Sequence, residues 1–136
     1  MKIIYYNLII LIIFSSCAKH KNTEYYLERS YHENGNIHTE IKKNNGVLEG
    51  ETKVWSENGN LIKKVNYTNN ILNGEMIEFY DNGNKMHEVF YINGFKNGSE
   101  IWYYENGMPK SEVVYNNSKK ISETIRWDIN GDIIYK

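Results

Sequence analysis

The chain has 136 residues, and its 16 lysines and arginines nearly balance its 17 aspartates and glutamates. This balance excludes the strong positive charge that draws a protein to nucleic acid or to an anionic membrane surface, so we expect no nucleic-acid partner. The 12 tyrosines, the single proline and the single cysteine favour strands over helices and leave no cysteine pair for a disulfide.

Residues 1–16 are predicted to be a helical signal peptide. Lys2 gives a positive start, and residues 3–14 are almost entirely apolar. This run is shorter than the roughly 20 residues that a membrane-spanning helix needs, but it is typical of the apolar centre of a secretory signal. Two serines follow it, and then comes Cys17, the only cysteine.

Small residues followed by cysteine at this position resemble a bacterial lipoprotein signal, although Phe14 stands where that family usually has leucine. The resemblance implies that Cys17 becomes the lipidated first residue of the cleaved chain and that residues 17–24 form a polar, lipid-anchored tether. It places the protein in the cell envelope, outside the cytoplasm, at the periplasmic face of the outer membrane. The alternative is an ordinary signal peptide, or an uncleaved anchor, with a free cysteine.

From residue 25 to residue 136 the chain consists of about five copies of a 24-residue unit. All ten glycines fall into three columns of this repeat, which is the signature of a tandem array. One column follows asparagine in every copy and is predicted to mark the hairpin turns. Its members are Gly35, Gly59, Gly83, Gly107 and Gly131.

Side chains between the turns recur at intervals of two residues, which is the period of a strand. Asn-Gly between two such runs predicts a type I′ hairpin turn, and a longer second turn, such as residues 93–98, is expected to lead into the next unit. The predicted fold is therefore all-β, an elongated single-layer antiparallel meander of tandem hairpins. The last copy has only a short return strand, over residues 133–136.

These columns resemble the MORN repeat variant. They are clearest in Gly74-Glu75, Phe79-Tyr80, Asn82-Gly83, Tyr91 and Gly94, with Gly98 closing the unit. Many proteins of this type are described as antitoxin components of the YwqK kind. The resemblance implies a binding or scaffolding role, with no catalytic residue and no cofactor.

No chemical site can be assembled from the sequence. The histidines, His20, His32, His38 and His87, lack metal-ligand spacing and are interpreted as surface residues. Carboxylates recur in columns, such as Glu51, Glu75 and Glu123, which indicates solvent exposure or turn hydrogen bonds. No phosphate loop or nucleophile elbow is present, so we expect no enzyme.

The aromatic residues divide into a regular set and an irregular one. One aromatic residue precedes each hairpin glycine by four positions and is interpreted as the core of the repeat, although the same row could be an exposed binding surface. The members of this row are Tyr31, Trp55, Phe79, Tyr103 and Trp127. The irregular aromatics are expected on the other face, as a partner-binding patch. They are Tyr80, Phe90, Trp102 and Tyr104.

The expected function is therefore that of a lipid-anchored, non-catalytic repeat protein that binds another protein or an envelope component. A specific form of this hypothesis is an antitoxin-like or immunity-like role against a toxin that acts in the envelope. The alternative is a structural one, in which the repeats scaffold an envelope complex or contact membrane lipid directly.

Overall fold

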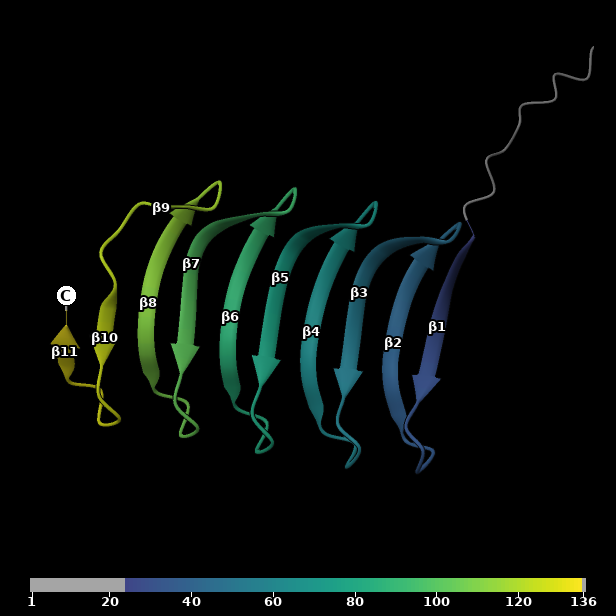
Figure 1. Ribbon diagram of the computed structural model, residues 1–136, viewed down its shortest axis with the longest axis horizontal. Helices are drawn as coiled ribbons and strands as arrows, with labels where there is room; N and C mark the ends of the chain where they lie inside the picture. The colour runs from purple at the N-terminus through teal and green to yellow at the C-terminus, as the bar shows by residue number, and fades with distance from the viewer. Residues whose placement is uncertain (1–23, 136) are drawn as a thin grey trace, which may run out of the picture.

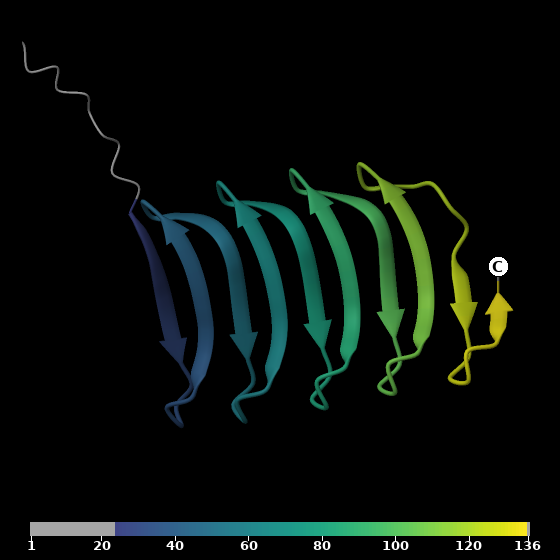
Figure 2. The same cartoon turned by 180° about the vertical axis from the view of Figure 1, so that it is seen from behind.

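The computed structural model describes residues 24–135, and all of their regular structure is β. One antiparallel sheet of 11 strands runs as a meander (Figure 1). Seen from behind, the sheet is again uncovered (Figure 2). The predicted all-β, single-layer fold is confirmed. The expected signal peptide and Cys17 lie outside the described residues.

The first eight strands are seven to nine residues long, and the last three are shorter. In chain order they are β1 (Tyr25–Tyr31), β2 (Ile37–Asn44), β3 (Val47–Trp55), β4 (Leu61–Thr68), β5 (Ile71–Phe79), β6 (Lys85–Ile92), β7 (Phe95–Tyr103), β8 (Pro109–Asn116), β9 (Lys119–Lys120), β10 (Ile125–Trp127) and β11 (Ile133–Tyr135). Consecutive strands pair from β1 to β8, β8 then pairs with both β9 and β10, and β10 pairs with β11. Within residues 24–135 there is no helix long and apolar enough to cross a membrane.

The tight two-residue turns lie at the end of the sheet where a longer turn was predicted. Asn45-Gly46 joins β2 to β3, and both residues have positive φ, at 49° and 82°. Positive φ at both central residues is the requirement of a type I′ turn. The equivalent turns are Asn69-Asn70, Asn93-Gly94 and Asn117-Ser118. The prediction for residues 93–98 was therefore wrong, because residues 95–98 already belong to β7.

The five hairpin glycines lie in the loops at the opposite end of the sheet, but these loops are not type I′ turns. In the first loop only Gly35 has a positive φ, at 87°, and Asn34 does not. The Gly35 amide donates to the His32 carbonyl, and the His32 amide donates to the Asn36 carbonyl. This is a three-residue loop closed by a bulge at glycine, which is the next most common hairpin connection.

Polar side chains tie each repeat to the following one at both ends of the sheet. At the end that carries the five hairpin glycines, the Asn34 side-chain amide donates to the Glu57 carbonyl at 2.7 Å, and Asn82 and Asn106 bond in the same way two and three units further along. At the other end, the Asn70 side chain accepts from the Leu48 amide at 2.8 Å. Asparagine thus recurs in columns because it satisfies backbone groups of a neighbouring turn.

Burial in the single layer is shallow. Val65, Ile77 and Val89 are the only apolar residues among those described that are buried, with 4%, 7% and 3% of their surface exposed. Val65 and Val89 both pair with Met76 and share one face, which we call the valine face. Ile77 points to the other face, because successive residues of a strand alternate.

The regular aromatic row lies on the same face as Ile77, which we call the aromatic face. Tyr31 is 60% exposed, and the other four members, Trp55, Phe79, Tyr103 and Trp127, are half-buried. The interpretation of this row as a buried core is therefore corrected. No second layer covers the aromatic face within residues 24–135, so only neighbouring strands shield these rings.

The regular pattern breaks where the repeat lacks its strand glycine. Gly50, Gly74 and Gly98 all have positive φ inside long strands, beside the register shifts that indicate bulges. Ser122 holds the equivalent place in the next unit, and there the strand is divided into β9 and β10. The Ser122 hydroxyl instead accepts from the Val114 amide at 2.9 Å.

We expect Gly74→Ala to destabilise the sheet more than Gly98→Ala. Both positions have positive φ, at 113° and 86°, so each alanine introduces backbone strain of about 1–3 kcal/mol. A Cβ at Gly74 would also lie 3.0 Å from the Asn66 Cβ, whereas at Gly98 nothing lies within 4 Å. Urea unfolding followed by circular dichroism measures both free energies of unfolding. Equal losses would contradict this account of the bulge.

Candidate functional site

The aromatic face carries a continuous row of cross-strand partners whose character changes along the sheet. In order the row is Arg29, Glu40, Lys53, Lys64, Ile77, Glu88, Ile101, Glu112 and Ile125. The first four positions hold three cations and one carboxylate. The last five alternate isoleucine with glutamate, so this half of the face combines apolar surface with negative charge.

A shallow hollow of about 210 Å³ lies in the apolar and acidic half of this face. Ile77 and Ile101 line its floor, and Phe90 borders it with 43% of its surface exposed. Glu75 and Glu88 contribute carboxylates to its lining. Glu75 is an exposed residue, whereas Glu88 is half-buried. The hollow can therefore receive an apolar side chain close to negative charge.

Hydrogen bonds hold two carboxylates in this half of the face, those of Glu88 and Glu112. The Tyr103 hydroxyl donates to Glu88, and the Ser99 hydroxyl donates to Glu112 at 2.6 Å. Burial raises the pKa of Tyr103 well above its usual value, and the bond to the Glu88 carboxylate raises it further. The tyrosine therefore stays protonated and keeps its donor role.

Tyr80 and Tyr104 do not belong to a free patch. The Tyr80 hydroxyl donates to the Tyr103 carbonyl at 2.7 Å, and the Tyr104 hydroxyl donates to the Trp127 carbonyl at 3.0 Å. Each side chain thus reaches from its own loop to the next repeat, as His32 does with the Trp55 carbonyl at 2.9 Å. Both tyrosines are half-buried, and their contacts explain them as structural ties.

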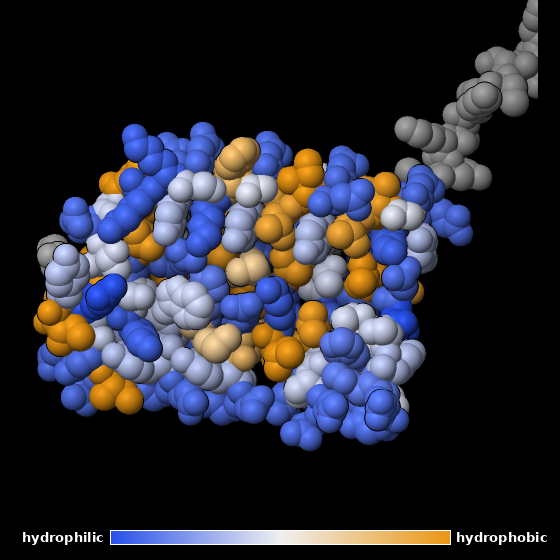
Figure 3. Space-filling model, in the orientation of Figure 1, coloured by the Kyte–Doolittle hydropathy of each residue, from blue (hydrophilic) through white to orange (hydrophobic). Residues whose placement is uncertain are grey.

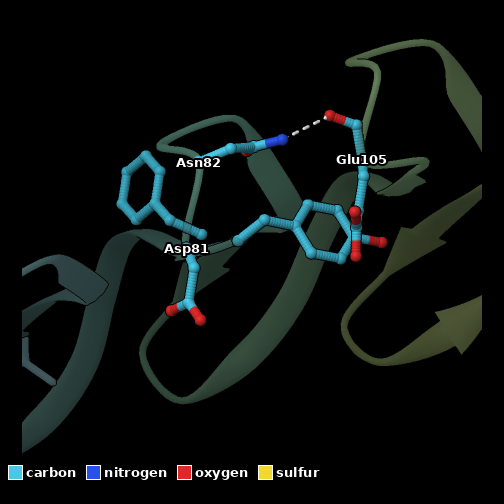
Figure 4. A pocket seen from close by; sticks show the side chains of 5 residues that line it. Asp81, Asn82 and Glu105 are labelled. Carbon is cyan, nitrogen blue, oxygen red and sulfur yellow. Dashed lines mark hydrogen bonds between the residues drawn. The ribbon is translucent and has the colours of Figure 1, made fainter.

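A second hollow, of about 490 Å³, lies beside Tyr80, at the end of the sheet that carries the five hairpin glycines. Phe79, Tyr80, Asp81, Asn82 and Glu105 line it. In Figure 4 the Asn82 side chain reaches across to the Glu105 carbonyl, at 2.9 Å, while the Asp81 carboxylate points away from that bond. This hollow follows from the spacing of two adjacent loops.

Phe90 and Trp102, the other two predicted partner-binding residues, lie on opposite faces. Phe90 pairs with Glu75, two residues before Ile77, and so belongs to the aromatic face. Trp102 pairs with His87, two residues before Val89, and so belongs to the valine face. The prediction that the four irregular aromatics form one patch was therefore wrong.

A buried polar cluster occupies the valine face between β5 and β7. The His87 Nδ1 lies 3.3 Å from a Glu78 oxygen, and its Nε2 lies 3.0 Å from a Glu100 oxygen. Lys63 extends the cluster to Glu78 at 2.9 Å, and Lys96 reaches Glu100 at 2.5 Å. Both imidazole nitrogens therefore lie beside carboxylate oxygens, one from each neighbouring strand.

His87 and Glu100 are buried, at 5% and 7% exposure. The interpretation of His87 as a surface residue was therefore wrong. Burial would raise the pKa of Glu100, but hydrogen bonds from Lys96 and His87, together with their charges, hold this pKa below its ordinary value. In the same way, Lys63 and His87 outweigh burial and lower the pKa of Glu78. Paired charges thus compensate for the loss of water.

The remaining predicted residues form no further site. His32 is half-buried and His38 is exposed, with ring centroids 4.4 Å apart, and His20 lies outside the described residues. Across residues 24–135 no group of three or more histidine, cysteine, aspartate or glutamate side chains is placed to hold a metal ion. The valine and aromatic faces are both mixed in character, and Figure 3 shows hydrophilic and hydrophobic side chains interspersed over the face in view.

Comparison with known protein families gives one match. The family described as MORN repeat variant matches residues 27–42, 48–69, 72–93 and 96–117, which together make up more than half of the chain. Each of the last three matches begins inside a long strand after a tight turn and ends at the next tight turn. No curated protein matches the chain.

The lowered pKa values of Glu78 and Glu100 predict a loss of stability in acid. The unfolded chain binds protons more readily than the folded chain at these two groups, so their contribution is complete above the unfolded pKa of about 4.3. It is lost as the pH falls through the lower folded values. Urea unfolding between pH 3 and pH 7 should show a shallower acid loss for Glu100→Gln than for the wild type, and superimposed profiles would contradict the prediction.

Proposed function

Because the chain belongs to the MORN repeat variant family, we propose that it is a non-catalytic repeat protein that binds another protein on its aromatic face. In this proposal the sheet is held in the cell envelope by a lipid on Cys17. The observation that carries it is the hollow beside Phe90, in which an exposed ring and an isoleucine floor lie next to carboxylates.

The chemistry of this half of the face indicates what the partner presents. Protein interfaces draw most of their affinity from a few apolar anchors that enter pockets, and the hollow between Ile77, Ile101 and Phe90 fits one such anchor. The exposed Glu75 at its border favours a lysine or arginine beside that anchor. The proposed partner therefore presents a basic and apolar surface.

An antitoxin-like or immunity-like role is the most specific form of this proposal. A lipid on Cys17 would hold the sheet outside the cytoplasm, at the periplasmic face of the outer membrane, where it would meet a toxin that acts in the envelope. The near-neutral charge of the chain supports recognition by local patches rather than by a strong overall field.

A second candidate function is direct contact with membrane lipid. Tyr25, Tyr26 and Leu27 begin the first strand, next to the expected tether, and they are 54%, 40% and 50% exposed. Tyrosine suits a membrane interface because one end of its ring is apolar and the other is wet. In this alternative β1 rests on the bilayer and the repeats act as a scaffold.

We expect Cys17→Ser to release the protein from the membrane. Without the thiol no lipid can be attached, so the protein should move from the detergent-soluble membrane fraction to the aqueous fraction of isolated envelopes. Labelling with a fatty-acid probe should mark the wild type and not the variant. Wild-type protein that takes up no fatty acid would overturn the proposed anchor.

Phe90→Ala combined with Glu75→Lys should abolish capture of the partner while the sheet stays folded. The first change removes the exposed ring and the second reverses the charge beside the hollow. The measurement is affinity capture of tagged full-length protein from its own envelope, with mass spectrometry of what is bound. Ile129→Ala is the matched control, because Ile129 is an exposed apolar residue in a loop away from the hollow.

The partner should be retained by the wild type and by the control and lost by the double variant. Retention by all three proteins would reject the aromatic face as the docking surface. Binding of non-lipidated protein to liposomes, and its loss on Leu27→Ser, would favour the lipid-contact alternative instead.

A further inference from the structure

The buried polar cluster on the valine face occurs in one part of the sheet, and its residues do not recur in the other repeat units. His87 has Lys63 and Ser111 one unit before and after it, and Glu100 has Met76 and Thr52 in the preceding units. Strands of the same length form with each of these side chains. The fold therefore does not need a histidine and a glutamate at these positions.

Burying such groups is costly unless each is paired, and an apolar replacement is often at least as stable. Val89 and Met76 show that this face accepts apolar side chains at neighbouring positions. The cluster does have one structural effect, which is to hold an aromatic ring. The Trp102 ring lies parallel to the His87 ring, with centroids 4.0 Å apart and planes 14° apart.

Trp102 is thereby fixed from one side while 41% of its surface remains exposed. Because carboxylates hold His87 at both nitrogens, the indole rests on a rigid support. A large ring held in one orientation loses little conformational freedom on binding, and this is the property that preorganised binding sites share. The exposed part of the ring is therefore available for contact with a ligand.

The strands beyond Trp102 supply the rest of a site. Trp102 pairs with Ser111 on β8, and Ser111 pairs with Arg126 on β10. Two strand spacings separate the indole from the arginine, which is roughly 10 Å between backbones, and the side chain between them is small. Arg126 is exposed, its guanidinium lies 5.7 Å from the Tyr135 ring centroid, and no carboxylate pairs with it among residues 24–135.

From this geometry we infer that Trp102, Ser111 and Arg126 form a binding site for an acidic saccharide. The apolar face of a sugar ring stacks on the open side of the indole, and its hydroxyls reach Ser111. A carboxylate on the same or the adjacent sugar pairs with the Arg126 guanidinium, whose fork of donors matches carboxylate geometry. This site is on the opposite face from the proposed protein-binding hollow, so it does not depend on that proposal.

Isothermal titration of the soluble Cys17→Ser protein tests the inference, with three acidic probes and their neutral counterparts. The probes are an oligogalacturonate, a sialyl oligosaccharide and a muramic-acid-containing disaccharide. At least one acidic probe should bind, and its neutral counterpart should bind about tenfold more weakly. Arg126→Gln should remove that preference, because only the guanidinium recognises the carboxylate.

Trp102→Ala should weaken binding of the acidic probe by about tenfold or more, as expected for loss of an aromatic stacking partner. Ser111→Leu fills the gap and leaves both rings of the Trp102 and His87 stack in place, so it should have the same effect, and circular dichroism checks that the sheet stays folded. Ile71→Ala is the matched control, because Ile71 is an exposed apolar residue at the start of β5, outside this site, and it should bind like the parent protein. Failure of all three acidic probes to bind, or unchanged binding by Ser111→Leu, would overturn the inference.

Discussion

Backbone pairing between consecutive strands is the interaction on which this molecule depends. A domain with two layers gains most of its burial from side chains that meet between the layers, whereas here each side chain is covered only by its neighbours in the same sheet. Val65, Ile77 and Val89 are accordingly the only buried apolar residues in residues 24–135. A constant repeat length is then a physical necessity, because a slip of one residue would move every side chain of a strand to the other face.

Because few apolar side chains are buried, hydrogen bonds at the two ends of the strands contribute to holding successive repeats together. The two kinds of turn do this differently. Tight turns such as Asn45-Gly46 fix the pairing of adjacent strands, while loops such as that of Asn34 reach across to the following loop. The hydroxyls of Tyr80 and Tyr104 act with these loops, since each bonds to a carbonyl of the next unit. Few of these contacts are buried, so each contributes little alone, and the array is stabilised by their repetition.

The sequence was sufficient for the fold because spacing alone decides it, but not for the two turn types or the site. The pairs that include Asn34-Gly35 were predicted to be the tight turns, yet the column that includes Asn45-Gly46 and Asn69-Asn70 forms them. The prediction relied on the Asn-Gly pair itself and did not count how many residues lie between the last paired backbone groups of the two strands. Phe90 could have been placed correctly, since it adjoins Val89 and must face the other way. The cluster of Glu78, His87 and Glu100 could not, because these residues meet only through the register of three strands.

A single layer also has a consequence for binding that two-layer domains lack. Both of its faces are open, so a protein beside Phe90 and a saccharide beside Trp102 would contact opposite sides of the same strands without competing. Each would act as part of the missing second layer and would shield side chains that are otherwise only half-buried. Any ligand that binds the folded sheet and not the unfolded chain adds to the free energy of unfolding. In a sheet with so little buried apolar surface, a ligand on either face would therefore raise the free energy of unfolding.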